Sequence, residues 1–219
     1  MTVASDRIEK RFKSTAASRT FRNLRTYLSL ESRAVLDVGC SYGEFLVLFG
    51  RGSVGVTLEP EEVAYGRERG LAIVNGNIED EHFVQTLEQR FDVIFANNIL
   101  EHLYAPHTFL TQSKRFLKEG GNLMVGVPCV PRIRFLTRFK KFRGCMASQH
   151  INFFTRDTLR LTVERAGWIV EGVRGFRLKP RLLDHLLDAI YPHFYVIARP
   201  DPAFEYSEKR KRELQGYHT

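Results

Sequence analysis

The chain has 219 residues, 43% of them hydrophobic, which is enough to bury the core of one sizeable domain. It contains no apolar run near the ~20 residues that span a bilayer and no apolar signal-peptide segment at its start, so we expect a soluble, cytoplasmic protein. Three cysteines without disulfide-framework or metal-ligand spacing agree with a reducing compartment, and the net charge of +8 favours anionic partners.

Helical and strand-like patterns alternate along the chain. Apolar side chains recur roughly on one side of residues 6–30, which predicts an N-terminal helical cap over residues 1–30. Short apolar runs predict strands at 34–38, 53–58, 72–74, 91–96, 122–127, 168–173 and 194–198. Helical patterns between them cover 43–49, 60–70, 80–89, 106–117, 155–166 and 180–190.

This order predicts an α/β fold with a doubly wound, mostly parallel seven-stranded sheet and right-handed crossovers. The last two strands are joined by a helical excursion, which predicts an antiparallel edge strand. We expect residues 1–219 to form a single domain that carries a basic insertion at 130–150 and a C-terminal tail at 201–219. The mixed charges of that tail predict a solvated helix or disorder.

A glycine loop follows the first predicted strand, where Asp37 ends a Val-Leu-Asp-Val run and Gly39 and Gly43 lead into a predicted helix. Glycine allows the backbone of such a turn to approach a ligand, and amides at a helix N-terminus can hold a carboxylate. Asp37 can accept a hydrogen bond from an ammonium group or order the loop. The loop therefore suits the zwitterionic end of an amino acid.

With these residues the chain resembles the class I S-adenosylmethionine-dependent methyltransferases. The resemblance is strongest to the group of ubiquinone and menaquinone biosynthesis enzymes and of small-molecule and sugar methyltransferases. It runs from about residue 34 to 198 and includes the Leu-Glu-His-Leu run at 100–103 after the fourth strand. Further similar segments are 35–40, 91–97, 116–121, 150–154 and 159–167. The resemblance implies a Rossmann-like methyltransferase fold, S-adenosyl-L-methionine as cofactor and S-adenosyl-L-homocysteine as product.

The resemblance also implies a set of cofactor-binding residues. Ser41 stands where the family usually has its middle glycine, and Thr57 stands where an acid usually binds the ribose. The segment around Thr57 looks like that of cyclopropane fatty acid synthases, where a threonine and a polar residue five positions later hold the ribose. This resemblance implies that Thr57 and Glu62 hold the ribose here. The alternatives are that Glu59 takes the place of Glu62, or that both glutamates are merely solvated. Asn77 and Ile78 would flank the adenine, unless they form an ordinary turn. The implied cofactor-binding set is Asp37, Gly39, Cys40, Gly43, Thr57, Leu58, Glu62, Asn77, Ile78 and Asn97.

Two histidines lie beyond predicted strand ends, where an acceptor would bind. His150 is the first candidate for a base or an acceptor-orienting group, because histidine titrates near neutral pH; the alternative is a structural histidine bonded to backbone. His102 is the second candidate. In ubiquinone O-methyltransferases a Glu-x-x-Glu-His run is associated with a divalent metal. Here Asn98 replaces its first acid before Glu101, and we therefore predict no metal site.

The insertion at 130–150 carries six basic residues and no acid. Phe135, Leu136, Phe139 and Phe142 recur at helical spacing, which predicts a short amphipathic helix. It could close as a lid on an anionic acceptor, rest on an anionic membrane near a lipid-linked acceptor, or be a packed insertion with a solvated charged face.

The predicted function is O-methylation of a small-molecule or glycan-type acceptor with anionic character. One alternative is an RNA-modifying methyltransferase, which the charge suggests but no recognisable RNA-binding module supports. The other is a protein of this fold that binds the cofactor without catalysis.

Overall fold

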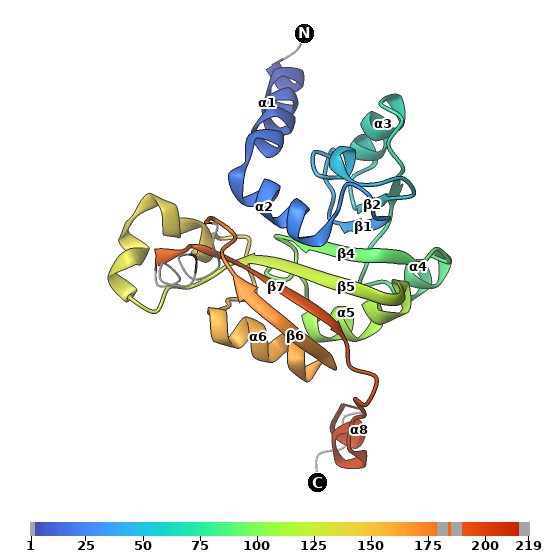
Figure 1. Ribbon diagram of the computed structural model, residues 1–219, viewed down its shortest axis with the longest axis vertical. Helices are drawn as coiled ribbons and strands as arrows, with labels where there is room; N and C mark the ends of the chain where they lie inside the picture. Colours follow the sequence, from blue (N-terminus) through green and yellow to red (C-terminus); the bar gives the residue numbers. More distant parts are fainter. Residues whose placement is uncertain (1–2, 179–183, 185–189, 215–219) are drawn as a thin grey trace.

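A seven-stranded sheet forms the centre of the computed structural model, which describes residues 3–178, 184 and 190–214. The strand order is β3-β2-β1-β4-β5-β7-β6 (Figure 1). The strands are β1 Val35–Val38, β2 Val54–Thr57, β3 Ile73–Asn75, β4 Phe91–Asn97, β5 Leu117–Pro128, β6 Trp168–Arg174 and β7 His193–Pro200. β7 runs antiparallel to β5 and to β6, between which it lies, and the other pairs are parallel. The predicted fold class is confirmed.

Helices cover both faces of the sheet. On one face α5 (Pro106–Ser113) and α6 (Arg156–Arg165) contribute Leu110 and Leu159 to the larger core cluster. On the other face α2 (Arg19–Leu28) packs Phe21 and Leu24 against Phe95 of β4. The remaining crossover helices are α3 (Pro60–Glu68) and α4 (Glu81–Thr86). The predicted helices at 60–70, 80–89, 106–117 and 155–166 are therefore present, each shorter than expected.

The predicted N-terminal cap consists of two helices. α1 (Val3–Ala17) ends before Ser18, whose hydroxyl accepts a hydrogen bond from the Phe21 amide and so starts α2 afresh. α1 projects from the sheet beside α3 (Figure 1). Arg11 of α1 forms an ion pair with Glu44, which lies in the loop after β1. The N-terminal segment thus contacts the glycine loop as well as the core.

Two predicted helices are wrong. The segment 43–49 holds only one short 3-10 helix, η1 (Leu46–Leu48), because Ser41 and Gly43 have positive φ and cannot begin an α-helix. The basic insertion forms two 3-10 helices, η3 (Arg134–Arg138) and η4 (Lys140–Met146), separated by the extended backbone of Phe139. The apolar residues there do not share one stripe, since Phe142 is buried while Phe139 is half exposed.

Towards the C-terminus, the predicted helix at 180–190 falls outside the described residues except for Asp184 and Ile190. The tail contains α8 (Glu208–Leu214), which matches the helical alternative for this segment. Within the part of the chain that the structure describes, no helix has the length and hydropathy needed to cross a membrane.

Candidate functional site

The loop after β1 is shaped by three residues in the left-handed region, Gly39 (φ 72°), Ser41 (φ 49°) and Gly43 (φ 87°). A Cβ atom on Gly39 would lie 1.9 Å from Cδ1 of Ile99, so any other residue would displace that side chain and strain the backbone at φ 72°. The amides of Gly39 and Cys40 donate to the Val56 carbonyl at 2.9 and 3.0 Å. These two amides therefore close the loop onto β2.

Asp37 lies in β1 beneath this loop and is 2% exposed. Its Oδ2 atom is buried and has no partner among the described residues. Burial raises the pKa of Asp37 well above its usual value, and the nearby Glu44 carboxylate raises it further. A buried carboxylate oxygen without a donor is costly, and an ammonium group would supply the missing donor. The geometry thus fits the role expected of Asp37 toward an amino-acid end.

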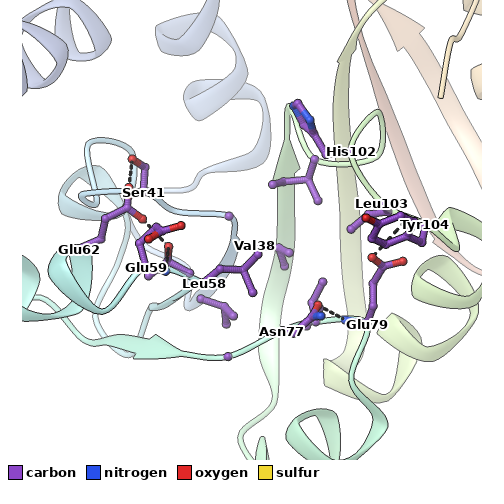
Figure 2. Close-up of a pocket in the computed structure, with 16 residues that line it drawn as sticks. Val38, Ser41, Leu58, Glu59, Glu62, Asn77, Glu79, His102, Leu103 and Tyr104 are labelled. Atoms are coloured by element: carbon purple, nitrogen blue, oxygen red, sulfur yellow. Dashed lines mark hydrogen bonds between the residues drawn. The ribbon is translucent and has the colours of Figure 1, made fainter. Parts of the chain in front are cut away.

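A cavity of about 350 Å³ opens at the carboxyl ends of β1, β2 and β3 and beside the loop that follows β4 (Figure 2). Parallel sheets of this kind bind ligands at the crevice where the strand order reverses, here between β1 and β4. The predicted residues that line it are Gly39, Thr57, Leu58, Glu62, Asn77, Ile78 and His102. Asp37, Cys40, Gly43, Asn97 and His150 are not among the described lining residues.

A hydrogen-bonded group of three side chains stands at one end of the cavity (Figure 2). The Thr57 hydroxyl donates to Oε2 of Glu62, and the Ser41 hydroxyl donates to Oε1 at 2.7 Å. Thr57 and Glu62 are both buried, whereas Leu58 is 63% exposed. Ser41, which the sequence shows only as a replaced glycine, therefore orients Glu62. Glu59 lines the cavity beside this group as the N-cap residue of α3.

The opposite end of the cavity joins the loops after β3 and β4. Asn77 accepts a hydrogen bond from the Glu79 amide at 2.9 Å, and Ile78 is buried. The Glu79 carboxylate accepts from the amides of Tyr104 at 3.1 Å and Ala105 at 2.6 Å. Sequence reasoning missed Glu79 and Tyr104 as lining residues. Their position in the loops that follow β3 and β4, two successive strands of the chain, was the available signal.

His102 and His150 lie together near the cavity, with ring centroids 4.8 Å apart. His102 Nδ1 is 3.2 Å from the Gln149 carbonyl, while His150 Nδ1 is buried and has no partner among the described residues. Burial and the neighbouring His102 lower the pKa of His150. The structure therefore brings together the two histidines that the sequence singles out.

Glu101 adds a carboxylate to this pair. It is 1% exposed, and burial raises its pKa to about 7. One ligand atom from each of Glu101, His102 and His150 lies within 4.8 Å of the others, a set that could hold a metal ion although the sequence predicts none. Asn98 does not face this group, because its Oδ1 is 2.8 Å from His193 Nε2.

A family model described as a methyltransferase domain matches residues 9–172, well over half of the chain. The chain therefore belongs to the methyltransferase domain family. This confirms the predicted membership of the class I S-adenosylmethionine-dependent methyltransferases.

Individual relatives match shorter stretches. The ubiquinone biosynthesis O-methyltransferase of Nitrosococcus oceani is 32% identical over 107 residues, covering 46% of this chain and 45% of the relative. The tRNA U34 carboxymethyltransferase of Hydrogenovibrio crunogenus is 31% identical over 122 residues, covering 47% of this chain and 34% of the relative. The chain thus spans less than half the length of these relatives. The solved structure of an S-adenosylmethionine-dependent methyltransferase from Archaeoglobus fulgidus shares the fold, with a TM-score of 0.60 and 18% identity. The match covers 85% of this chain and 96% of that chain.

Proposed function

We propose that this protein transfers a methyl group from S-adenosyl-L-methionine to a hydroxyl group of a small-molecule or glycan-type acceptor with anionic character. The observation that carries the proposal is the cavity, in a methyltransferase domain, that is lined by a tight glycine loop and by the Thr57–Glu62 pair. The buried carboxylate of Asp37, which has no partner among the described residues, lies in β1 beneath that loop. When bound, the cofactor supplies a methyl group activated by a sulfonium. S-adenosyl-L-homocysteine is the product. Free, buried cysteines are in keeping with a cytoplasmic protein.

Each end of the cavity suits one part of the cofactor. Asp37 would hold the ammonium group, and the loop from Gly39 through Cys40 to Gly43 would leave room for the backbone to approach. Thr57 and Glu62 offer hydroxyl and carboxylate oxygens to a cis-diol. Asn77, Ile78 and the exposed face of Leu58 would flank the adenine, with one polar edge and apolar walls. Asn97, at the end of β4, is not among the described residues that line the cavity.

The protein's remaining task is to position the acceptor, exclude water and receive a proton. His150 is our first candidate for the group that orients the acceptor, and His102 is the second. The lowered pKa of His150 keeps its imidazole neutral at physiological pH, and its unpartnered Nδ1 is available to an acceptor.

The basic insertion at 130–150 supports an anionic acceptor. Arg138 and Lys141 lie in its two 3-10 helices, and Phe135 (58% exposed) and Phe139 (51% exposed) present apolar surface among these charges. A cationic and aromatic surface next to the carboxyl end of β5 suits an acidic acceptor, including one carried on an anionic membrane.

A second candidate function is RNA modification. The net charge of +8 and the partial similarity to a tRNA U34 carboxymethyltransferase favour it. Methylation of a purified tRNA that is lost above moderate salt, with no methylation of small hydroxyl compounds, would replace the small-molecule proposal.

Thr57→Val and Glu62→Gln are each expected to weaken binding of S-adenosyl-L-homocysteine about 10- to 100-fold, because a charge-assisted hydrogen bond contributes ~1.5–3 kcal/mol. Calorimetric titration measures this, and thermal unfolding checks that the Ser41–Glu62 contact is not needed for folding. Glu59→Gln is the matched control and should bind nearly as well as wild type. Strong weakening by Glu59→Gln with normal binding by Glu62→Gln would transfer the ribose contact to Glu59.

Replacing both Arg138 and Lys141 by Gln is expected to raise the acceptor KM roughly 3- to 10-fold at low salt and to weaken its salt dependence. Cofactor affinity should not change, and His150→Ala should instead lower kcat. Arg90→Gln with Arg115→Gln removes the same charge from exposed positions elsewhere and serves as the control. Unchanged kinetics in both the double variant and His150→Ala would show that the insertion only packs against the domain.

A further inference from the structure

A second polar cluster lies at the carboxyl edge of the sheet, on the face that α2 covers. Asn97 of β4 pairs with Gly126 of β5, which pairs with Tyr195 of β7, and His193 lies two residues before Tyr195. A Cβ atom on Gly126 would be 2.6 Å from Asn97 Oδ1 and 2.7 Å from the Tyr195 ring. The missing side chain of Gly126 therefore lets Asn97 and Tyr195 meet above β5.

Asn98 fixes the imidazole of His193. Its Oδ1 lies 2.8 Å from His193 Nε2, and its own amide donates to the Gly126 carbonyl at 2.7 Å. Asn98 is held in the left-handed region, at φ 57°, to make these contacts. Because a carbonyl oxygen only accepts, this contact favours the tautomer with the proton on Nε2 and a lone pair on Nδ1.

Two buried acceptor atoms in this cluster have no donor in the part of the chain that the structure describes. His193 Nδ1 and Asn97 Oδ1 are both buried and without a hydrogen-bond partner among the described residues. An unsatisfied buried acceptor is destabilising, so a ligand that brings a donor would be stabilised here. A hydroxyl group is such a donor, and its oxygen keeps lone pairs for reaction.

The charges around the cluster favour an uncharged imidazole and a partly anionic ligand. Burial and, after it, the Arg177 guanidinium lower the pKa of His193 to about 3, while burial raises the pKa of Tyr195 to about 12. The loop that carries Arg177 is fixed, because its amide donates to Oδ1 of the buried Asp184 at 3.0 Å. His193 and Tyr195 are thus both neutral at physiological pH, beside a cation.

The cluster adjoins the cofactor loop. Asn97 and Asn98 directly follow Ala96, which pairs with Val38, the residue before Gly39. Asn97 and Tyr195 point to the face with α2, whereas Leu100 and Leu103, which flank His102, belong to the core on the face with α5.

We propose that His193, oriented by Asn98, binds the acceptor hydroxyl and takes its proton during methyl transfer. This inference rests on the function proposed above. The acceptor oxygen forms a bond to the methyl carbon, the carbon–sulfur bond breaks with its electron pair going to sulfur, and the hydroxyl proton passes to Nδ1 and then to water. A weak base suffices, because an oxygen that carries both its proton and the new methyl is a far stronger acid than an imidazolium.

The tautomer of His193 tests the proposal without an acceptor. In histidine-labelled protein, nitrogen NMR near neutral pH should show Nε2 protonated and Nδ1 unprotonated at His193. Asn98→Ala should abolish this preference, and Asn98→Asp should keep it. A proton on Nδ1 in the wild-type protein would overturn the proposal, whatever acceptor is later found.

Turnover tests it with hydroxyl probes, namely catechol, 4-hydroxybenzoate and glucuronate, with release of S-adenosyl-L-homocysteine as the signal. For the probe that wild type methylates best, His193→Ala should lower kcat about 100-fold, in the range of general base catalysis, with unchanged affinity for S-adenosyl-L-homocysteine. Asn98→Ala should lower kcat less, and the exposed His82→Ala should match wild type. Wild-type kcat in His193→Ala overturns the inference, whereas failure of wild type to bind S-adenosyl-L-homocysteine would overturn the proposed function itself.

Discussion

Replacing Gly39 by valine is expected to abolish binding of S-adenosyl-L-homocysteine. Gly39 has φ 72°, where an L-residue costs roughly 1–2 kcal/mol, and its Cβ would lie 1.9 Å from Cδ1 of Ile99. Because Ile99 lines the cavity, relief of this clash must move a cavity wall or the loop itself. Isothermal titration calorimetry should detect no heat of binding for Gly39→Val.

Gly120→Val provides a matched control, because Gly120 has nearly the same backbone conformation (φ 70°) but nothing within 4 Å of an added Cβ. This variant should lose some stability from backbone strain and still bind S-adenosyl-L-homocysteine normally. Undiminished binding by Gly39→Val would show that the loop after β1 is not where the cofactor lies.

Asp37→Asn is expected to stabilise the fold near neutral pH and to weaken cofactor binding. The raised pKa of Asp37 means that the folded protein holds this proton more tightly than the unfolded chain. The protonated carboxyl therefore stabilises the fold at low pH. This contribution to the free energy of unfolding is lost as the pH rises from the ordinary pKa of 3.8 through the raised pKa of the folded state. Asparagine does not ionise, so the stability advantage of the variant over wild type should grow as the pH rises above about 4 in urea unfolding.

The same substitution removes the charge that an ammonium group would pair with. Affinity for S-adenosyl-L-homocysteine should fall about 10- to 100-fold, as for other charge-assisted hydrogen bonds. Asp92→Asn is the contrasting control, because the Ala34 amide and the Lys118 ammonium lower the pKa of Asp92. Relative to wild type, that variant should become less stable as the pH rises, and it should bind the cofactor normally. Wild-type affinity in Asp37→Asn would remove Asp37 from the site.

The sheet could be predicted from sequence because each strand contains a short apolar run, although β5 begins at Leu117, five residues before the run predicted at 122–127. The loops were harder to predict. Periodicity does not reveal the positive φ values of Ser41 and Gly43, which stop the helix expected at 43–49. In the basic insertion Phe139 and Phe142 have helical spacing, yet tertiary packing buries Phe142 and leaves Phe139 half exposed.

The candidate site was predictable where its residues are close in sequence. Thr57 and Glu62 are five residues apart on one strand and the following helix, and they form a direct hydrogen bond. Contacts between distant segments were not predictable from local pattern. The bond between Asn98 and His193 joins residues 95 apart, and only the pairing of β5 with β7 brings them together.

A structure of the protein with S-adenosyl-L-homocysteine tests the central claim most directly. We expect its adenine beside Asn77 and Ile78, its ribose hydroxyls on Thr57 and Glu62, and its ammonium group at Asp37. The sulfur should then face the carboxyl edge where the acceptor binds. A molecule that lies outside this cavity, or that leaves Oδ2 of Asp37 without a donor and both ribose hydroxyls away from Glu62, would contradict the assignment.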